Sequence, residues 1–268
     1  MLSKIVQGII QGLTEFLPVS SSGHLTLFQY FSGNHNLEEN MLTDIALHFG
    51  TLIAVLFYFR SDIVPYFTPA GWRDAARRRM AFLIITASIP TAAIGLIFKK
   101  QFEAAFAEPR LVCVALFITG LGLMLSEKLK NRFAQTEIAE FSYSKAIATG
   151  IAQGLAITPG ISRSGATIAT GLLLGLKGEE AARFSFLLMI PAVGGATLLE
   201  VKDIVKTGLP GGIEISATIA GTVAAAITGF LALKLLVYII KEQKLSYFAY
   251  YLFLVSTVSL IFIQFAGK

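Results

Sequence analysis

Hydroxyl-bearing and charged residues gather in two short segments that are rich in Ser, Gly and Pro. The segment at 160–167 reads Gly-Ile-Ser-Arg-Ser-Gly-Ala-Thr and stands just before an apolar run. A guanidinium group offers a planar fork of donors for phosphate oxygens, and backbone N–H groups at a helix N-terminus add further donors. We therefore expect Arg163 to bind a phosphate group, with the hydroxyls of Ser162, Ser164 and Thr167 around it. Helix capping is the alternative role of Ser164 and Thr167, and both roles can hold together.

The segment at 11–24 adds a carboxylate, three serines and an imidazole. Gln11 and Glu15 are four residues apart, so a helix places them on one face. Ser21 stands three residues before His24, close to the start of the helix that should follow. A serine beside an imidazole can act as a nucleophile, and histidine can also protonate a leaving group. The alternative for His24 is an interior histidine with satisfied hydrogen bonds.

Three other residues with reactive side chains are weaker candidates. His35 falls in a polar loop, and His48 lies inside an apolar run, where we expect a structural role. Cys113 is the single cysteine and also lies in an apolar run. We expect it to be a small buried hydrophobic residue.

The elements that position these residues are transmembrane helices. Of the 268 residues, 54% are hydrophobic and only 15% are charged, whereas soluble domains carry about 25% charged residues. The charges stand between apolar runs of about 17–22 residues, a length that crosses about 30 Å of hydrocarbon. The net charge of +5 therefore reflects loop residues that orient helices, and it does not indicate a nucleic-acid surface.

The hydropathy pattern predicts an all-α polytopic membrane protein with six full spans and two interrupted segments. The full spans are predicted at 42–59, 80–98, 111–127, 184–201, 213–233 and 246–265. The interrupted segments, 2–31 and 145–176, are each broken in the middle by Pro, Gly and Ser. Backbone that leaves helical geometry at membrane depth must find hydrogen bonds within the protein or in trapped water. We therefore expect each interrupted segment to be a re-entrant hairpin of two half-helices.

The two interrupted segments resemble each other, which predicts an internal repeat. Each contains Gln-Gly-Leu, then a proline and Ser-x-Ser-Gly, and three full spans follow each one. The single membrane domain, 1–268, thus divides into halves at 1–135 and 136–268. Interrupted helices at corresponding places in two halves point to a membrane-embedded site. Glu15 and Arg163 would lie at membrane depth, where ionisable groups favour function, with a structural Glu–Arg pair as the alternative.

The loop charges predict the orientation. Most of the 22 Lys and Arg residues stand in the loops at 60–79, 128–145, 177–183 and 234–245, which we assign to the cytoplasm. Because each half has three full spans, an odd number, the two halves are then inverted. The tips of the hairpins are expected to meet within the membrane, with both termini outside.

The segments 15–24 and 159–167 are similar to the two signature motifs of the bacitracin-resistance type undecaprenyl-pyrophosphate phosphatases, and the resemblance extends over essentially the whole chain. It implies hydrolysis of undecaprenyl pyrophosphate to the monophosphate, which recycles the lipid carrier for peptidoglycan synthesis and confers bacitracin resistance. It also implies a multi-pass protein of the bacterial cytoplasmic (inner) membrane, with a site open to the periplasmic side, and a divalent cation, Mg²⁺ or Ca²⁺. We allow for a homodimer.

The resemblance also assigns roles to residues. The core functional residues are Glu15, Ser21, His24 and Arg163, and those around the phosphate are Ser20, Ser162, Ser164, Gly165 and Thr167. Glu15, with Gln11, is expected to hold the cation through oxygen ligands. Gln11 stands where many members have a second Glu, which removes one charge from that site. Ser21 would attack phosphorus with His24 as base or acid, and attack by a metal-activated water is the alternative.

A different class of function also fits the predicted architecture. Inverted repeats with broken helices are typical of secondary transporters, so the alternative is a transporter or flippase of phosphorylated polyprenyl lipids. Ser21 and His24 favour the enzyme, because binding alone does not require a nucleophile beside an imidazole.

Overall fold

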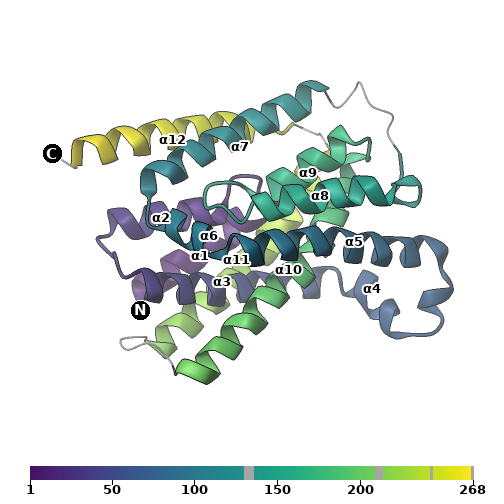
Figure 1. Cartoon of the computed structure of the whole chain (residues 1–268), viewed down its shortest axis with the longest axis horizontal. Coiled ribbons are helices and arrows are strands. Elements are labelled where there is room, and N and C mark those ends of the chain that lie inside the picture. The colour runs from purple at the N-terminus through teal and green to yellow at the C-terminus, as the bar shows by residue number, and fades with distance from the viewer. Residues whose placement is uncertain (130–135, 209–213, 242–243, 267–268) are drawn as a thin grey trace.

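Six long apolar helices form the frame of the protein (Figure 1). They belong to a computed structural model that describes residues 1–129, 136–208, 214–241 and 244–266. The six, in order, are α3 (Leu37–Tyr58), α5 (Ala75–Ile97), α7 (Pro109–Leu129), α10 (Gly178–Thr207), α11 (Ile215–Lys241) and α12 (Ser246–Ala266). Within these described ranges, all six are long and apolar enough to cross a membrane, as the sequence predicts.

Four of the six helices begin earlier than the predicted spans: α3, α5 and α10 by five or six residues, and α7 by two. α3 begins at Leu37 and α10 at Gly178, ahead of the expected starts at 42 and 184. α3 and α10 each have two glutamates in the first turn, where carboxylates interact favourably with the positive end of the helix dipole, and α5 has three arginines within its first five residues. Hydropathy does not detect such polar first turns, so the apolar pattern places the starts too late.

Both interrupted segments are pairs of helices, as predicted. The first pair is α1 (Leu2–Phe16) and α2 (Ser21–Phe31), and the second is α8 (Tyr143–Leu155) and α9 (Arg163–Leu173). Leu17 is extended, with ψ at 143°, because the residue before a proline disfavours helical geometry. The second helix of each pair starts with a serine cap: Ser20 accepts from the Gly23 amide, and Ser162 accepts from the Gly165 amide.

Short helices complete the connections between the long ones. α4 (Arg60–Ile63), η1 (Val64–Phe67) and η2 (Gly71–Arg73) lie between α3 and α5. α6 (Lys99–Phe106) precedes α7, and η4 (Ile138–Glu140) precedes α8. An ion pair between Asp62 and Arg183 joins the first of these loops to α10.

Each hairpin packs against a long helix from the other half of the chain. α1 lies along α11, and α8 lies along α5. Both contacts use glycine to bring backbones together: a Cβ atom on Gly8 would stand 2.1 Å from the Gly221 carbonyl oxygen, and one on Gly150 would stand 2.0 Å from that of Ala87. Close approach at small residues is the common way in which helices pack in lipid. The two halves are therefore interlocked around the breaks.

The buried core surrounds the breaks and is rich in aromatic residues. Phe16, at the end of α1, is fully buried and meets Phe186 of α10 edge to face, with ring centroids 5.8 Å apart. Cys113 is buried, as the sequence predicts. Large apolar side chains are exposed along all six long helices, as expected for helices that face lipid.

Candidate active site

The tips of the two hairpins are in direct contact, as the sequence predicts. The Ser164 hydroxyl donates to the Leu17 carbonyl at 3.1 Å, and the Ser20 hydroxyl donates to the Ile161 carbonyl at 3.4 Å. Thr119 of α7 supports the second break, since its hydroxyl donates to the Gly160 carbonyl at 3.0 Å. The polar backbone of each break thus finds partners in the other break and in α7, which is how irregular backbone is tolerated inside a membrane protein.

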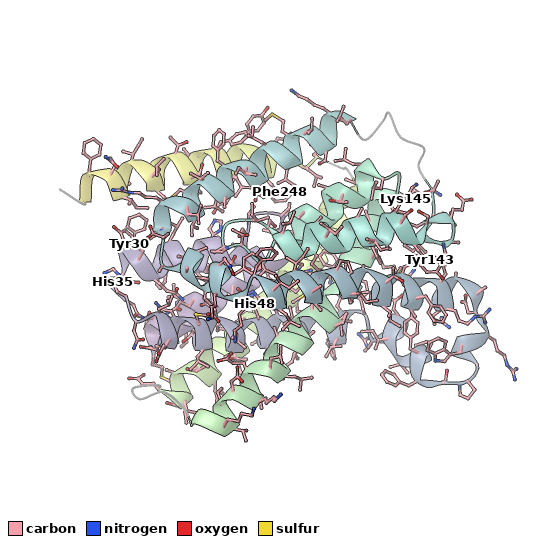
Figure 2. The ribbon with its side chains drawn as sticks, in the orientation of Figure 1. Tyr30, His35, His48, Tyr143, Lys145 and Phe248 are labelled. Atoms are coloured by element: carbon pink, nitrogen blue, oxygen red, sulfur yellow. The ribbon has the colours of Figure 1, made fainter. Side chains whose placement is uncertain are left out.

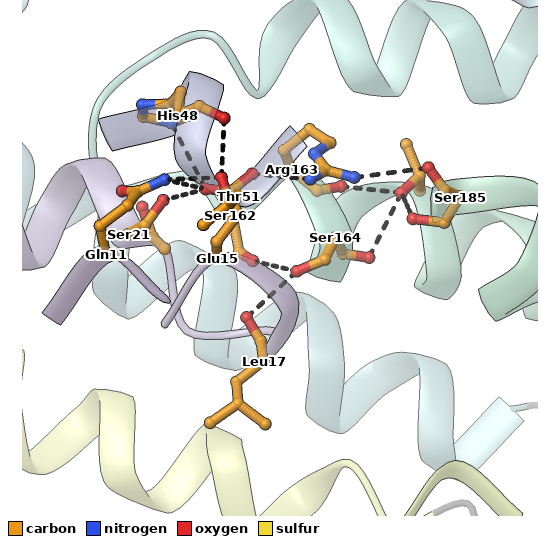
Figure 3. A network of polar contacts seen from close by, with 12 residues as sticks. Gln11, Glu15, Leu17, Ser21, His48, Thr51, Ser162, Arg163, Ser164 and Ser185 are labelled. Atoms are coloured by element: carbon orange, nitrogen blue, oxygen red, sulfur yellow. Dashed lines mark hydrogen bonds and ion pairs between the residues drawn. The ribbon is translucent and has the colours of Figure 1, made fainter. Parts of the chain in front are cut away.

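Glu15 is the centre of a buried polar network at this junction (Figure 3). Its Oε1 lies 2.6 Å from Nη2 of Arg163, at the start of α9. Its Oε2 accepts from the Ser21 hydroxyl at 2.5 Å and from Nε2 of Gln11 at 3.0 Å. Three other residues singled out in the sequence are therefore gathered around the Glu15 carboxylate, and one of them, Arg163, is 148 positions away from Glu15 in the chain.

His48, for which the sequence interpretation expects a structural role, joins the same network. Its Nε2 lies 3.3 Å from Oε2 of Glu15, and its Nδ1 lies 2.7 Å from the Asp44 carbonyl oxygen. Thr51, one turn further along α3, lies 3.4 Å from Nε2 of Gln11. An ionisable residue in an apolar span is a signal of function, and this signal could have identified His48. Nothing in the sequence distinguishes Thr51.

His24 lies outside this network. Its Nδ1 is 2.8 Å from the Ser20 carbonyl oxygen, and its Nε2 is 2.8 Å from the Tyr251 hydroxyl of α12. The rings of His24 and Tyr251 are stacked, with centroids 5.6 Å apart. Both ring nitrogens of His24 therefore face partners other than Ser21, and the expected pairing of the two side chains gives way to a Ser21–Glu15 pair. The catalytic role of His24 stays a prediction.

The hydroxyls of the second break make capping and bracing contacts. Ser162 caps the Gly165 amide at 3.0 Å and lies 3.2 Å from the Ser164 hydroxyl. Thr167 donates to the Arg163 carbonyl at 2.8 Å and lies 2.6 Å from the Ser185 hydroxyl of α10. The cap is thus Ser162, and not Ser164 or Thr167, for which the sequence left capping open. Those two hydroxyls brace the break instead. They fix the start of α9 and with it the Arg163 side chain.

Ser20 has a strained backbone. Its φ is 67°, in the left-handed region, and it is the one non-glycine residue with positive φ within the described ranges. Such conformations cost about 1–3 kcal/mol and cluster at functional sites, where the surrounding structure holds them in place. The strained residue directly precedes Ser21 and turns the chain into α2, so that the Ser21 hydroxyl points back towards Glu15.

The oxygen atoms around Glu15 fit a divalent cation only in part. Oε1 of Gln11 is buried and lacks a hydrogen-bond partner among the residues that the structure describes. An amide oxygen beside a carboxylate suits Mg²⁺ or Ca²⁺. Over those same residues, however, three or more His, Cys, Asp or Glu side chains never come together as a metal-binding group. The donor set therefore fits a cation that takes further oxygen ligands from a bound phosphate, rather than an all-protein cage.

The arrangement as a whole is suited to phosphoryl chemistry. A hydroxyl donates to a carboxylate that could accept its proton, and a guanidinium beside the same carboxylate can bind an anion. The start of α9 adds oriented backbone N–H groups at the same place. Every one of these groups comes from the two hairpin tips, so the tips form the candidate site.

Known proteins are similar to this chain over nearly its whole length. The model of the family described as bacitracin resistance protein BacA matches residues 4–258. The undecaprenyl-diphosphatase of Halothermothrix orenii is 44% identical to this chain over 259 residues, which cover 96% of each protein. That of Alkaliphilus metalliredigens is 42% identical over 270 residues, 96% of this chain and 97% of the relative. The undecaprenyl-diphosphatase of Methanobrevibacter smithii is 38% identical over 273 residues, again 96% of each.

Proposed function

The chain belongs to the bacitracin resistance protein BacA family, and we propose that it hydrolyses undecaprenyl diphosphate to undecaprenyl phosphate and inorganic phosphate. The observation that carries this function is the buried Ser21–Glu15–Arg163 cluster where the hairpin tips meet. The product is the lipid carrier for cell-wall synthesis, and its recycling confers bacitracin resistance.

Catalysis of phosphoryl transfer depends mainly on positioning and charge neutralisation. Arg163 binds the diphosphate through its guanidinium fork, helped by the amide groups at the start of α9. The Ser21 oxygen attacks the terminal phosphorus, and its proton passes to Oε2 of Glu15, 2.5 Å away. The bond from phosphorus to the bridging oxygen breaks, and undecaprenyl phosphate leaves. Water then hydrolyses the phosphoserine and restores the Ser21 hydroxyl.

The remaining residues position these groups. Ser20, Ser162, Ser164, Gly165 and Thr167 shape the two tips and contribute donors to the phosphate. His24 holds the first turn of α2 through the Ser20 carbonyl and Tyr251, and its role as base or as acid to the leaving group stays a prediction. A divalent cation, Mg²⁺ or Ca²⁺, would be held by Glu15 and the free amide oxygen of Gln11. When bound, it neutralises charge on the phosphate oxygens.

The protein works in the bacterial inner membrane, with its site open to the periplasmic side. The bias of Lys and Arg towards the loops assigned to the cytoplasm supports this orientation. The diphosphate headgroup reaches the hairpin tips, and the isoprenoid tail stays among the apolar helix faces. A homodimer stays a prediction.

Phosphate release from undecaprenyl diphosphate tests this function directly. We expect the protein, purified in detergent, to release phosphate, and Ser21→Ala to lose this activity while it still binds the lipid through Arg163. A purified, folded wild-type protein that binds the lipid and releases no phosphate would contradict the enzyme and favour the transporter.

A further inference from the structure

The two oxygens of Glu15 are held by partners of different kinds. Oε1 is paired with the positively charged Arg163 at 2.6 Å. Oε2 is approached by three side chains: the Ser21 hydroxyl, the Gln11 amide and Nε2 of His48, at 2.5, 3.0 and 3.3 Å. The Arg163 pair holds the carboxylate on one side, and the three partners of Oε2 determine its direction towards Ser21.

The Arg163 guanidinium cannot donate the same hydrogen bonds to Glu15 and to the substrate at the same time. The headgroup of a diphosphate carries several negative charges, and a guanidinium binds phosphate best through two parallel hydrogen bonds. In the structure, Nη2 of Arg163 donates to Glu15, and Nη1 lies 3.4 Å from the Ser185 carbonyl oxygen. Binding of the diphosphate therefore draws Arg163 away from Glu15. A buried carboxylate that loses its ion-pair partner needs another one to stay in place.

Among the groups that approach Oε2, His48 is the one suited to this task. Gln11 is a neutral amide whose Nε2 also lies near Thr51, and Ser21 gives up its hydrogen when it attacks. The His48 ring cannot turn freely, because Nδ1 lies 2.7 Å from the Asp44 carbonyl oxygen. A carbonyl oxygen only accepts hydrogen bonds, so Nδ1 donates to it and the ring keeps Nε2 directed towards Glu15. Nε2 donates to the carboxylate when it carries a hydrogen as well.

We propose that His48 is a positioning residue, which keeps Glu15 directed at Ser21 when Arg163 turns to the diphosphate. This inference rests on the proposed function and assigns to α3 a part in the reaction beyond that of the two hairpins. His48 acts through Glu15 and does not touch the substrate. Its loss should therefore lower kcat and leave the KM for the lipid nearly unchanged.

Two substitutions at position 48 and one control test the proposal. His48→Leu removes both hydrogen bonds, and His48→Gln keeps an amide N–H that can still reach Glu15. His35→Gln is the matched control, because His35 is exposed beside Tyr30 at the edge of the molecule (Figure 2), whereas His48 is half-buried against Glu15. Each variant is purified in detergent, its thermal unfolding is recorded, and kcat and KM are measured with undecaprenyl diphosphate.

We expect kcat to fall by roughly 100-fold in His48→Leu and about 10-fold in His48→Gln, the range typical of residues that orient a catalytic ligand. KM should stay within about threefold, and His35→Gln should match the wild type.

A kcat near the wild-type value in folded His48→Gln and His48→Leu would overturn the positioning role and leave the proposed function intact. A raised KM with unchanged kcat would also overturn it, since it would place His48 in substrate binding. If His48→Leu fails to fold, His48→Gln alone decides. A wild-type protein without phosphatase activity would overturn the proposed function and this role together.

Discussion

At the residue scale, one buried carboxylate links the proposed nucleophile, the arginine proposed to bind the diphosphate and a histidine from a third element. Glu15 shares Oε2 between Ser21 and His48 and offers Oε1 to Arg163. A buried ion pair broken on one side is strongly destabilising. The Glu15–Arg163 pair is therefore the structural pair that the sequence left open as an alternative. It also holds Arg163 at the place where we propose that the diphosphate binds.

Replacement of Arg163 by Lys tests the phosphate-binding role. Lys keeps the charge and can still pair with Glu15, but it lacks the planar fork for phosphate. We expect a folded protein whose kcat/KM falls by roughly 100-fold, the loss typical of one oriented anion donor. Arg73→Lys, in an exposed loop, is the control. Phosphate release by Arg163→Lys at the wild-type rate would rule out the arginine clamp.

Gln11→Glu tests the cation site. The change puts a second carboxylate four residues before Glu15 and removes the amide that donates to Oε2 at 3.0 Å. Two neighbouring carboxylates repel each other unless a cation lies between them. We expect the variant to bind Mg²⁺ about tenfold more tightly and therefore to reach half-maximal activity at a lower Mg²⁺ concentration than the wild type. An unchanged Mg²⁺ titration of phosphate release would exclude position 11 from the site.

The site could be predicted in outline from residue types and motif similarity, but its contacts could not. Glu15, Ser21 and Arg163 stand out because charge and hydroxyl groups are rare in apolar segments. Whether Ser21 faces His24 or Glu15 depends on the strained turn at Ser20, which no local pattern reveals. The contact of His48 with Glu15 cannot be predicted either, because it joins two helices that are separate in sequence.

At the element scale, the hairpins depend on glycines that let backbones touch. Gly8 of α1 faces the Gly221 carbonyl of α11, whereas Gly122 of α7 has open space beside it, with nothing within 4 Å of an added Cβ atom. The repeat of Gln-Gly-Leu in both hairpins could be recognised in the sequence. The helices against which the repeat glycines Gly12 and Gly154 pack could not be identified from the sequence, because their packing depends on how the two halves interlock.

A pair of glycine substitutions tests this packing. Gly8→Ala should push α1 away from α11 and lower the free energy of unfolding by about 1–3 kcal/mol, the usual effect of overpacking. Activity should fall too, because α1 carries Glu15 and Gln11. Gly122→Ala should leave stability unchanged or raise it by up to about 1 kcal/mol, since Ala favours the helix. Equal thermal unfolding of the two variants would contradict the close contact of α1 and α11.

At the scale of the whole molecule, the first helix of each half packs on a long helix of the other half: α1 on α11, and α8 on α5. This exchange is consistent with two inverted halves. Six spans and two paired half-helices follow from hydropathy and from Pro, Gly and Ser at the breaks, so this level was predictable. The orientation in the membrane rests on loop charge alone.

Single cysteines test that orientation. In a Cys113→Ala background, Arg73→Cys and Lys206→Cys each place a thiol at an exposed position, one between α3 and α5 and one near the end of α10. We expect an impermeant reagent to label Lys206→Cys in intact cells and Arg73→Cys only after the cells are opened. Labelling of both from the same side would contradict the inverted halves.

The most direct test of the whole account is to trap the phosphate on Ser21. Undecaprenyl diphosphate labelled in its terminal phosphate is mixed with the enzyme and quenched rapidly in acid. We expect label on a peptide that contains Ser21, at a level that rises and falls within one turnover. Ser21→Ala should carry no label and release no phosphate, whereas Ser22→Ala should keep both signals. Substantial phosphate release by Ser21→Ala would contradict attack by this serine and would favour a metal-activated water.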